Sequence, residues 1–217
     1  MTIRVLIADD QHLVRAGFRM ILAAEPDIEV VAEATDGASA LSLVRQTRPD
    51  VCLLDIQMPP PDGLEVTRRL AASGLQGAPK VVVVTTFDLD EYVYAALENG
   101  ASGFLLKDAG PALLVEAVRA AERGDALVSP QVTLRLLRHF AKERRRTPTT
   151  HPAERLTERE EEVVRAIARG LTNPEIAAEL FIAPSTVKSH ITSVQAKVGA
   201  RNRVEIAAWA FRAGLVT

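Results

Sequence analysis

The sequence predicts an α/β domain built on a doubly wound parallel sheet of five strands, followed by a small all-α domain. Three observations lead to this fold class. Short β-rich runs alternate with helical patterns through residues 1–125, whereas residues 154–217 show helical periodicity alone. The balance of charge also differs between the two parts, and a stretch with prolines and arginines separates them. A chain of 217 residues has room for two modest domains.

Five runs of apolar and β-branched residues are bounded by turns or charged residues, as buried parallel strands are. In chain order they are Ile3–Ala8, Ile28–Ala32, Val51–Leu54, Val81–Val84 and Phe104–Leu106, and the second run is the weakest. Helical patterns lie between them. The first has apolar residues at intervals of four, seven and eight, which form one face of an α-helix: Val14, Phe18, Ile21 and Leu22. This alternation predicts a sheet covered by helices.

Residues 126–153 are predicted to form a linker helix and a flexible linker. After Ser129-Pro130, a candidate helix runs through Leu134, Leu137 and Phe140, and a basic stretch with two prolines follows it. Four short helices are expected in residues 154–217. Their apolar positions are Val163, Val164 and Ile167; Ile176 and Leu180; Val187, Ile191, Val194 and Val198; and Ile206, Ala207 and Ala210. Trp209 and Phe211 suit either the core or a dimer surface.

Charge is distributed unevenly along the chain. Residues 1–125 hold 11 Lys and Arg against 19 Asp and Glu, a net charge of −8, whereas residues 126–217 hold 15 against 9, a net charge of +6. An acidic part joined to a basic part is typical of a nucleic-acid-binding domain attached to another module, although a solvated basic surface would look the same.

Two classes of protein are excluded by composition. No uncharged apolar stretch reaches the roughly 18 residues that a membrane helix needs, and no signal-peptide pattern begins the chain, so we expect a cytoplasmic protein without a membrane partner. The single cysteine, Cys52, lies in an apolar run. It suits the core, and disulfide frameworks or cysteine metal clusters cannot form within one chain.

Polar side chains follow several of the predicted strands. Asp9 and Asp10 come after the first, Asp55 after the third, Thr85 after the fourth and Lys107 after the fifth. Ligands of open α/β sheets collect at these carboxyl ends, where the strand order reverses. Three carboxylates brought together repel one another unless a cation lies among them, and their oxygens suit Mg²⁺.

This grouping also suits phosphoryl chemistry. Asp55 can act as a nucleophile that forms an aspartyl-phosphate, while the cation, Lys107 and the Thr85 hydroxyl stabilise charge on the phosphoryl oxygens. Each residue by itself has a simpler explanation: a helix cap for the acids, a satisfied hydroxyl for Thr85, a surface lysine for Lys107. Their joint placement at one edge of a sheet favours the functional interpretation.

Residues 1–125 resemble the receiver domain of two-component response regulators, which has a flavodoxin-like fold. The matching pieces are Asp9-Asp10, Asp55-Ile56-Gln57-Met58-Pro59-Pro60-Pro61-Asp62-Gly63, Thr85 and Gly103-Phe104-Leu105-Leu106-Lys107. The resemblance implies that Asp55 accepts a phosphoryl group from a sensor histidine kinase. It also implies that Asp9, Asp10, Asp55 and the backbone carbonyl of Gln57 hold Mg²⁺. Thr85 and Phe104 would be the switch residues, of which Thr85 grips the phosphoryl group together with Lys107.

The third helix of the basic part, roughly residues 185–198, has two contrasting faces. Val187, Ile191, Val194 and Val198 face inward, whereas Ser189, Thr192, Ser193 and Ala196 point the opposite way and Lys188 lies on a shoulder. A small polar face without acids can enter a major groove closely. The wheel alone favours a solvated face of an ordinary helical bundle.

Residues 154–217 resemble the LuxR-type helix-turn-helix domain. The matching pieces are Leu156-Thr157-Glu158-Arg159-Glu160, residues 170–177, Thr186-Val187-Lys188-Ser189-His190, Lys197-Val198-Gly199 and Arg201-Asn202-Arg203. With a receiver, this is the architecture of the NarL/FixJ family of response regulators. It implies that residues 185–198 are the recognition helix, that Lys188, Ser189 and Thr192 face bases, and that His190, Lys197 and Arg201 belong to the DNA-binding set. Ala183 stands where a capping serine or threonine is common.

We therefore expect a transcriptional regulator rather than an enzyme. Phosphorylation is expected to shift Thr85 and Phe104, favour a homodimer and free the recognition helix for promoter DNA. The alternatives are a small-molecule phosphatase, a DNA-binding protein whose receiver needs no phosphate, and a flavin-binding module. Against the first, Gln57 stands where haloacid-dehalogenase-like enzymes have a second acid.

Overall fold

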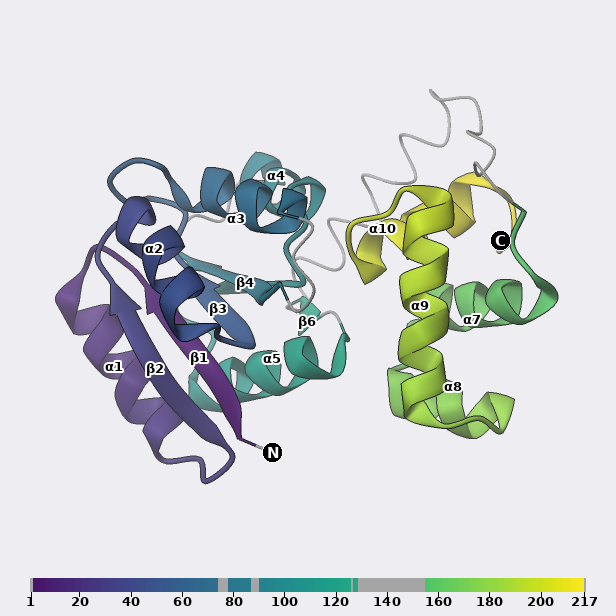
Figure 1. Cartoon of the computed structure of the whole chain (residues 1–217), viewed down its shortest axis with the longest axis horizontal. Coiled ribbons are helices and arrows are strands. Elements are labelled where there is room, and N and C mark those ends of the chain that lie inside the picture. Colours follow the sequence, from purple (N-terminus) through teal and green to yellow (C-terminus); the bar gives the residue numbers. More distant parts are fainter. Residues whose placement is uncertain (1, 74–77, 87–89, 126, 129–154, 217) are drawn as a thin grey trace. The chain divides into compact units, whose positions relative to one another are not determined.

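The computed structural model describes residues 2–73, 78–86, 90–125, 127–128 and 155–216. The chain divides into two compact units, Met1–Val132 and Thr133–Thr217, drawn from purple to teal and from green to yellow in Figure 1. The predicted linker helix through Leu134, Leu137 and Phe140, and the basic stretch after it, lie outside the described residues.

The first unit is a parallel sheet whose five principal strands are the predicted ones. They are β1 (Ile3–Ala8), β2 (Ile28–Ala34), β3 (Val51–Leu54), β4 (Lys80–Thr85) and β5 (Gly103–Leu106). A sixth strand of two residues, β6 (Leu127–Val128), pairs with β5 and was not predicted. Two residues are too few for a periodic signal, and only their pairing identifies them as a strand.

The strand order is β2-β1-β3-β4-β5-β6, and all pairings are parallel. Since β1 lies between β2 and β3, the order of the strands reverses there. Doubly wound sheets bind ligands at the carboxyl ends of the strands beside such a point. The topology therefore directs attention to the residues that follow β1 and β3.

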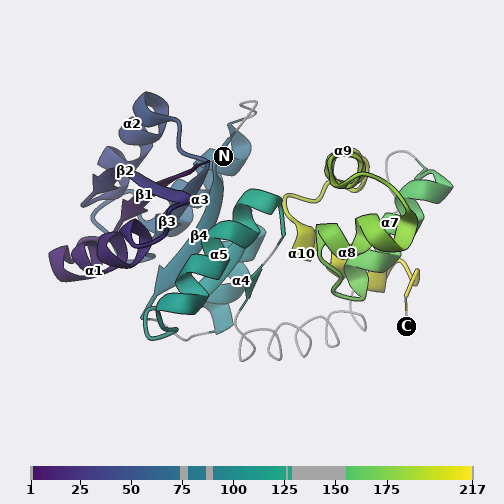
Figure 2. The same cartoon turned by 90° about the horizontal axis from the view of Figure 1, so that it is seen from below.

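Helices cover both faces of this sheet (Figures 1 and 2). One face is covered by α1 (His12–Ala23) and α5 (Pro111–Arg123). The other is covered by α2 (Gly37–Thr47), α3 (Gly63–Ala72) and α4 (Asp90–Glu98). The predicted two-sided arrangement is confirmed.

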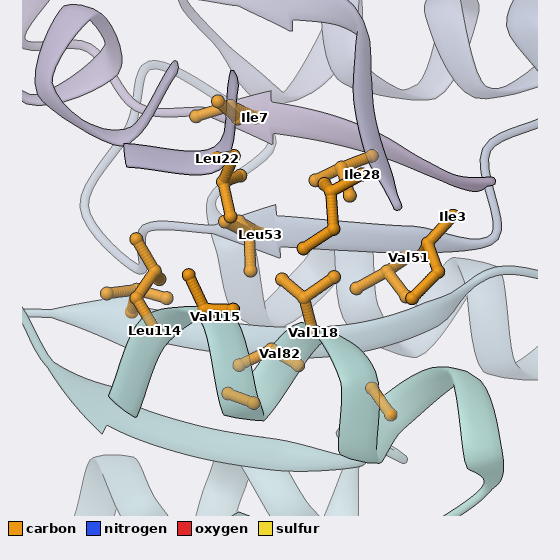
Figure 3. Close-up of a cluster of buried hydrophobic side chains, with 14 of the residues drawn as sticks. Ile3, Ile7, Leu22, Ile28, Val51, Leu53, Val82, Leu114, Val115 and Val118 are labelled. Carbon is orange, nitrogen blue, oxygen red and sulfur yellow. The ribbon is translucent and has the colours of Figure 1, made fainter. Parts of the chain in front are cut away.

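The core beneath α1 and α5 is made of aliphatic side chains. Figure 3 shows Leu22 of α1 and Leu114, Val115 and Val118 of α5 directed toward strand residues such as Leu53. Burial of each such side chain contributes roughly 1.5–3 kcal/mol. Phe18 and Ile21 pack at the margin of this cluster, as the spacing of the helical pattern predicts. Cys52 is fully buried in β3.

The described residues of the second unit, 155–216, form the four predicted helices. They are α7 (Glu158–Ala168), α8 (Asn173–Leu180), α9 (Pro184–Val198) and α10 (Arg203–Arg212). Val163, Ile176, Val187 and Ile206 are fully buried among them, and Trp209 packs into the same cluster. Of the two settings considered for Trp209, the structure assigns it to the core. No helix in the described parts of the chain is long and apolar enough to cross a membrane.

Candidate functional site

The acidic cluster forms at the carboxyl edge of the sheet, on both sides of the point where the strand order reverses. Asp9 is the first residue after β1, and Asp55 is the first after β3. Oxygen atoms of Asp9, Asp10 and Asp55, one from each carboxylate, all lie within 4.8 Å of one another. Asp9 and Asp55 are buried, whereas Asp10 is exposed. The structure thus brings together the three acids that the strand ends predicted.

Lys107 reaches into this cluster from the end of β5. Its Nζ lies 2.8 Å from Asp55 Oδ2, to which it donates a hydrogen bond, and 2.6 Å from Asp9 Oδ2. The other oxygen of each acid accepts a backbone N–H, from Gln11 to Asp9 and from Ile56 to Asp55. The Lys107 side chain is only 9% exposed, so solvent screens these contacts weakly.

The charges of this site are incompletely balanced. Burial raises the pKa of Asp9, although Lys107 and the Gln11 N–H oppose that rise. Burial also disfavours the charge on Lys107, but its close contacts with Asp55 and Asp9 outweigh burial and raise the pKa of the ammonium. Asp9 Oδ2 is buried without a hydrogen bond of acceptable geometry, despite its close charge contact with Lys107. One ammonium contacts two of three clustered carboxylates, and this donor set fits a divalent cation such as Mg²⁺.

Thr85, Phe104 and Gln57 are placed around the acids by neighbouring strands and loops. Thr85 ends β4, is fully buried and lies beside β5, where its carbonyl oxygen accepts the backbone N–H of Lys107 at 2.9 Å. Phe104 of β5 pairs with Val83 of β4, and its ring is completely buried. Gln57 is an exposed residue of the loop that begins with Asp55. The roles of these three residues stay predictions.

Sequence reasoning did not identify Arg15, which supports the acids from α1. Its side chain is buried, and Nη1 donates a hydrogen bond of 2.8 Å to the carbonyl oxygen of Asp9. Nε lies 3.7 Å from Glu33 on β2. Arg15 therefore ties the segment that carries Asp9 and Asp10 to α1 and to β2. An isolated arginine in a helix has no pattern that distinguishes it from a surface residue.

Gly63 supports the other acid. Its N–H donates a hydrogen bond of 2.9 Å to the carbonyl oxygen of Ile56. A Cβ at this position would lie 1.9 Å from the carbonyl oxygen of Asp55. Only glycine allows α3 to begin so close to the Asp55 backbone. The neighbouring Asp62 caps α3 by accepting the N–H of Glu65.

The second candidate site is the exposed face of α9. Lys188, Ser189 and Thr192 are all exposed, as the helical wheel predicts. The two hydroxyl groups donate to backbone carbonyls one turn earlier, Ser189 to Ser185 and Thr192 to Lys188, each at 3.1 Å. Ala183 is the N-cap of α9, and no side chain caps the helix there. Alanine at this position therefore leaves the start of α9 without a side-chain cap.

Glu160 links α9 to α7 and changes the prediction for two residues. Its carboxylate accepts hydrogen bonds from Ser193 Oγ at 2.6 Å and from Lys197 Nζ at 2.8 Å. Ser193 is half-buried, so its assignment to the outward face is wrong: Glu160 of α7 draws it inward. Lys197 has an internal partner and is 19% exposed, and its contact with DNA remains a prediction.

The remaining predicted DNA contacts lie around α9 as well. His190 is half-buried on this helix. Arg201, in the turn after it, pairs with Glu205 of α10 through Nη2 and Oε1 at 2.7 Å. Both contacts with DNA stay predictions. Figure 2 shows α9 in cross-section beside α7 and α8, which together support it.

Comparison with known proteins covers both units. Residues 5–119 match the response regulator receiver domain, and residues 154–210 match the bacterial regulatory proteins of the luxR family. The transcriptional regulatory proteins YxjL and LiaR of Bacillus subtilis are 41% and 40% identical to the chain, over 99% of it and 97% and 99% of their own lengths. The oxygen regulatory protein NreC of Staphylococcus aureus is 38% identical over 98% of the chain and 99% of its own length.

Solved structures give the same result. The response regulator ChrA of a heme-sensing two-component system aligns with a TM-score of 0.54 and 39% identity, over 99% of both chains. The signal receiver domain of NarL from Mycobacterium tuberculosis aligns with a TM-score of 0.55 and 39% identity, over 57% of this chain and 98% of its own.

Proposed function

Because the chain belongs to the two-component response regulators that join a receiver domain to a LuxR-type DNA-binding domain, we propose that phosphorylation of Asp55 controls its binding to promoter DNA. The combination of domains makes the protein a transcription factor. The observation that carries the proposal is the position of Asp55, buried beside Asp9 and in contact with Lys107, next to the reversal of strand order.

The contacts of Asp55 suit a phosphoryl acceptor. One carboxylate oxygen attacks the phosphorus of a phosphohistidine on a sensor kinase, the P–N bond breaks and the imidazole leaves. Lys107, already 2.8 Å from Asp55 Oδ2, follows the new phosphoryl oxygens and stabilises their charge. Thr85 supplies a hydroxyl beside Lys107. The Ile56 N–H holds the other carboxylate oxygen of Asp55 in place.

Asp9, Asp10 and Asp55, with the carbonyl of Gln57, would hold Mg²⁺. When bound, the cation neutralises charge on the transferring phosphoryl group. Asp9 Oδ2 supports this assignment, because it is buried, accepts no hydrogen bond and has its charge balanced only in part by the Lys107 ammonium at 2.6 Å. In this proposal Asp55 is phosphorylated once per signalling cycle. We therefore expect no turnover of small phosphate esters by the protein.

The test is phosphorylation of the full chain by acetyl phosphate with and without Mg²⁺, read by intact mass. Wild type should gain one phosphoryl group only when Mg²⁺ is present, and Asp55→Asn should gain none. Asp62→Asn is the matched control: it lies in the same loop, and asparagine caps a helix as well as aspartate does. Labelling of Asp55→Asn to the wild-type extent would refute the proposal.

A further inference from the structure

Phe181 occupies an unfavourable position in the turn between α8 and α9. It is the C-cap of α8 and adopts the left-handed conformation, with φ 54° and ψ 46°. The left-handed conformation is unfavourable for a residue with a Cβ, which is why glycine and asparagine usually occupy it. The residue is also 95% exposed. In the described residues, no other position combines an exposed large apolar side chain with positive φ.

The fold of the DNA-binding unit does not require an aromatic residue at position 181. The turn itself is made by the backbone: the N–H of Ile182 donates to the carbonyl of Ala177 at 3.0 Å. Asparagine would form the same turn with less strain. Because the ring is almost wholly exposed, it contributes little burial to the core of this unit. A strained and exposed aromatic residue indicates a role outside the folded unit.

The surroundings of Phe181 suit duplex DNA. The residue lies two positions before Ala183, where the candidate recognition helix begins, and Ala183, Pro184, Ser185 and Lys188 are exposed. No acidic residue occurs between Glu179 and Glu205. A helix that enters the major groove by its first turns brings the preceding turn to the rim of the groove, where sugars and phosphates lie.

We propose that the Phe181 ring packs on deoxyribose of the DNA backbone at the rim of the major groove. The inference rests on the proposed function, since α9 must enter DNA for the ring to reach it. Deoxyribose offers apolar C–H groups to the ring, so the contact adds affinity without reading sequence. It is not ionic, so it releases no counterions.

These properties distinguish a contact with deoxyribose from a contact that reads sequence and from an ionic contact. The variant Phe181→Asn removes the ring and relieves the strained backbone. We expect it to weaken binding to a duplex recovered by genomic mapping, and to a scrambled duplex of equal length, by the same factor of about five. The dependence of log affinity on log salt should keep its slope. Melting of the DNA-binding unit, followed by Trp209 fluorescence, should rise by about 4 °C.

Three control variants complete the experiment. Phe181→Tyr keeps the ring and should bind both duplexes as wild type does. Arg48→Asn relieves the other non-glycine left-handed residue, the C-cap of α2, and should leave DNA affinity unchanged. Lys188→Gln should reduce the salt slope, because it removes a cation from the predicted interface.

Wild-type affinity of Phe181→Asn for both duplexes would overturn the inference while the proposed function stands. A smaller salt slope in that variant would also overturn it, since the helix itself would then have moved. A change in the oligomeric state of the free protein with unaltered DNA affinity would assign the ring to contact between copies. If wild type bound no duplex, the proposed function would fail together with the inference.

Discussion

Lys107 lies between the buried carboxylates of Asp9 and Asp55 and can neutralise only part of their charge. Its raised pKa keeps it protonated throughout the physiological range. The contact of 2.8 Å with Asp55 places a mobile ammonium where phosphoryl oxygens are expected to appear. A lysine suits this position because its compact charge sits on a flexible side chain. The ammonium can therefore move from the Asp55 carboxylate to the phosphoryl oxygens.

At the same scale, Arg15 is expected to position the metal ligands. Arg15→Met removes the hydrogen bond to the Asp9 carbonyl and leaves Glu33 without its inner partner. Because groups behind metal ligands typically affect affinity 10- to 100-fold, we expect Mg²⁺ affinity to fall about tenfold. Calorimetric titration of the full chain with Mg²⁺ measures it.

Arg19→Met is the matched control for this prediction. Arg19 approaches the same Glu33 at 3.5 Å but is 60% exposed, and no hydrogen bond joins it to Asp9. Its variant should bind Mg²⁺ as wild type does. Equal losses in the two variants would mean that Glu33, rather than the hold on Asp9, controls the site.

At the scale of elements, α7 and α9 are joined by one carboxylate. Glu160 completes the capping box of α7 with Thr157 and binds Ser193 and Lys197 of α9. Burial works against its charge, but hydrogen bonds from Lys197, Ser193 and Thr157 outweigh burial and lower its pKa to about 2. The orientation of the candidate recognition helix therefore depends in part on a carboxylate of another helix.

This link predicts an acid dependence of stability. The pKa of Glu160 falls from its ordinary 4.5 to about 2 on folding, so its stabilisation is complete above pH 4.5 and is lost as pH falls toward 2. Glu160→Gln should lower the free energy of unfolding by about 2 kcal/mol at neutral pH. It should also flatten the decline of stability with acid. Denaturant unfolding followed by Trp209 fluorescence measures both.

Glu161→Gln is the control for Glu160. Glu161 forms a half-exposed pair with Arg165 one turn along α7, and such pairs contribute roughly 0.3–0.5 kcal/mol. An equal loss of stability in the two variants would show that the buried position of Glu160 adds nothing.

At the scale of the whole molecule, the two units must communicate if phosphorylation controls DNA binding. A phosphoryl group adds roughly 1.5–2 negative charges at the sheet edge. We expect loading of Asp55 to favour a homodimer and raise promoter affinity about tenfold, a typical allosteric coupling. Light scattering and binding to one promoter fragment, with and without beryllofluoride, measure the two effects. Identical oligomeric state and affinity in both conditions would contradict the coupling.

Local patterns in the sequence were sufficient to predict most of the helices and strands. Runs of apolar and β-branched residues located β1 to β5, and apolar spacing located α1 and α7–α10, because these patterns are properties of neighbouring residues. The topology of a doubly wound sheet then placed Asp9, Asp55 and Lys107 at one edge without coordinates. Strand β6 escaped prediction because its identity depends on pairing alone.

The sequence alone determined the two-part architecture and the residues of the acidic cluster. Only the tertiary structure decided what holds those residues in place: Arg15 behind Asp9, Gly63 against the Asp55 backbone, and Glu160 on Ser193 and Lys197. The physical reason is the separation along the chain over which each effect acts. Periodicity acts over a few neighbouring residues, whereas a hydrogen bond or an ion pair between distant segments depends on which helices and strands pack together.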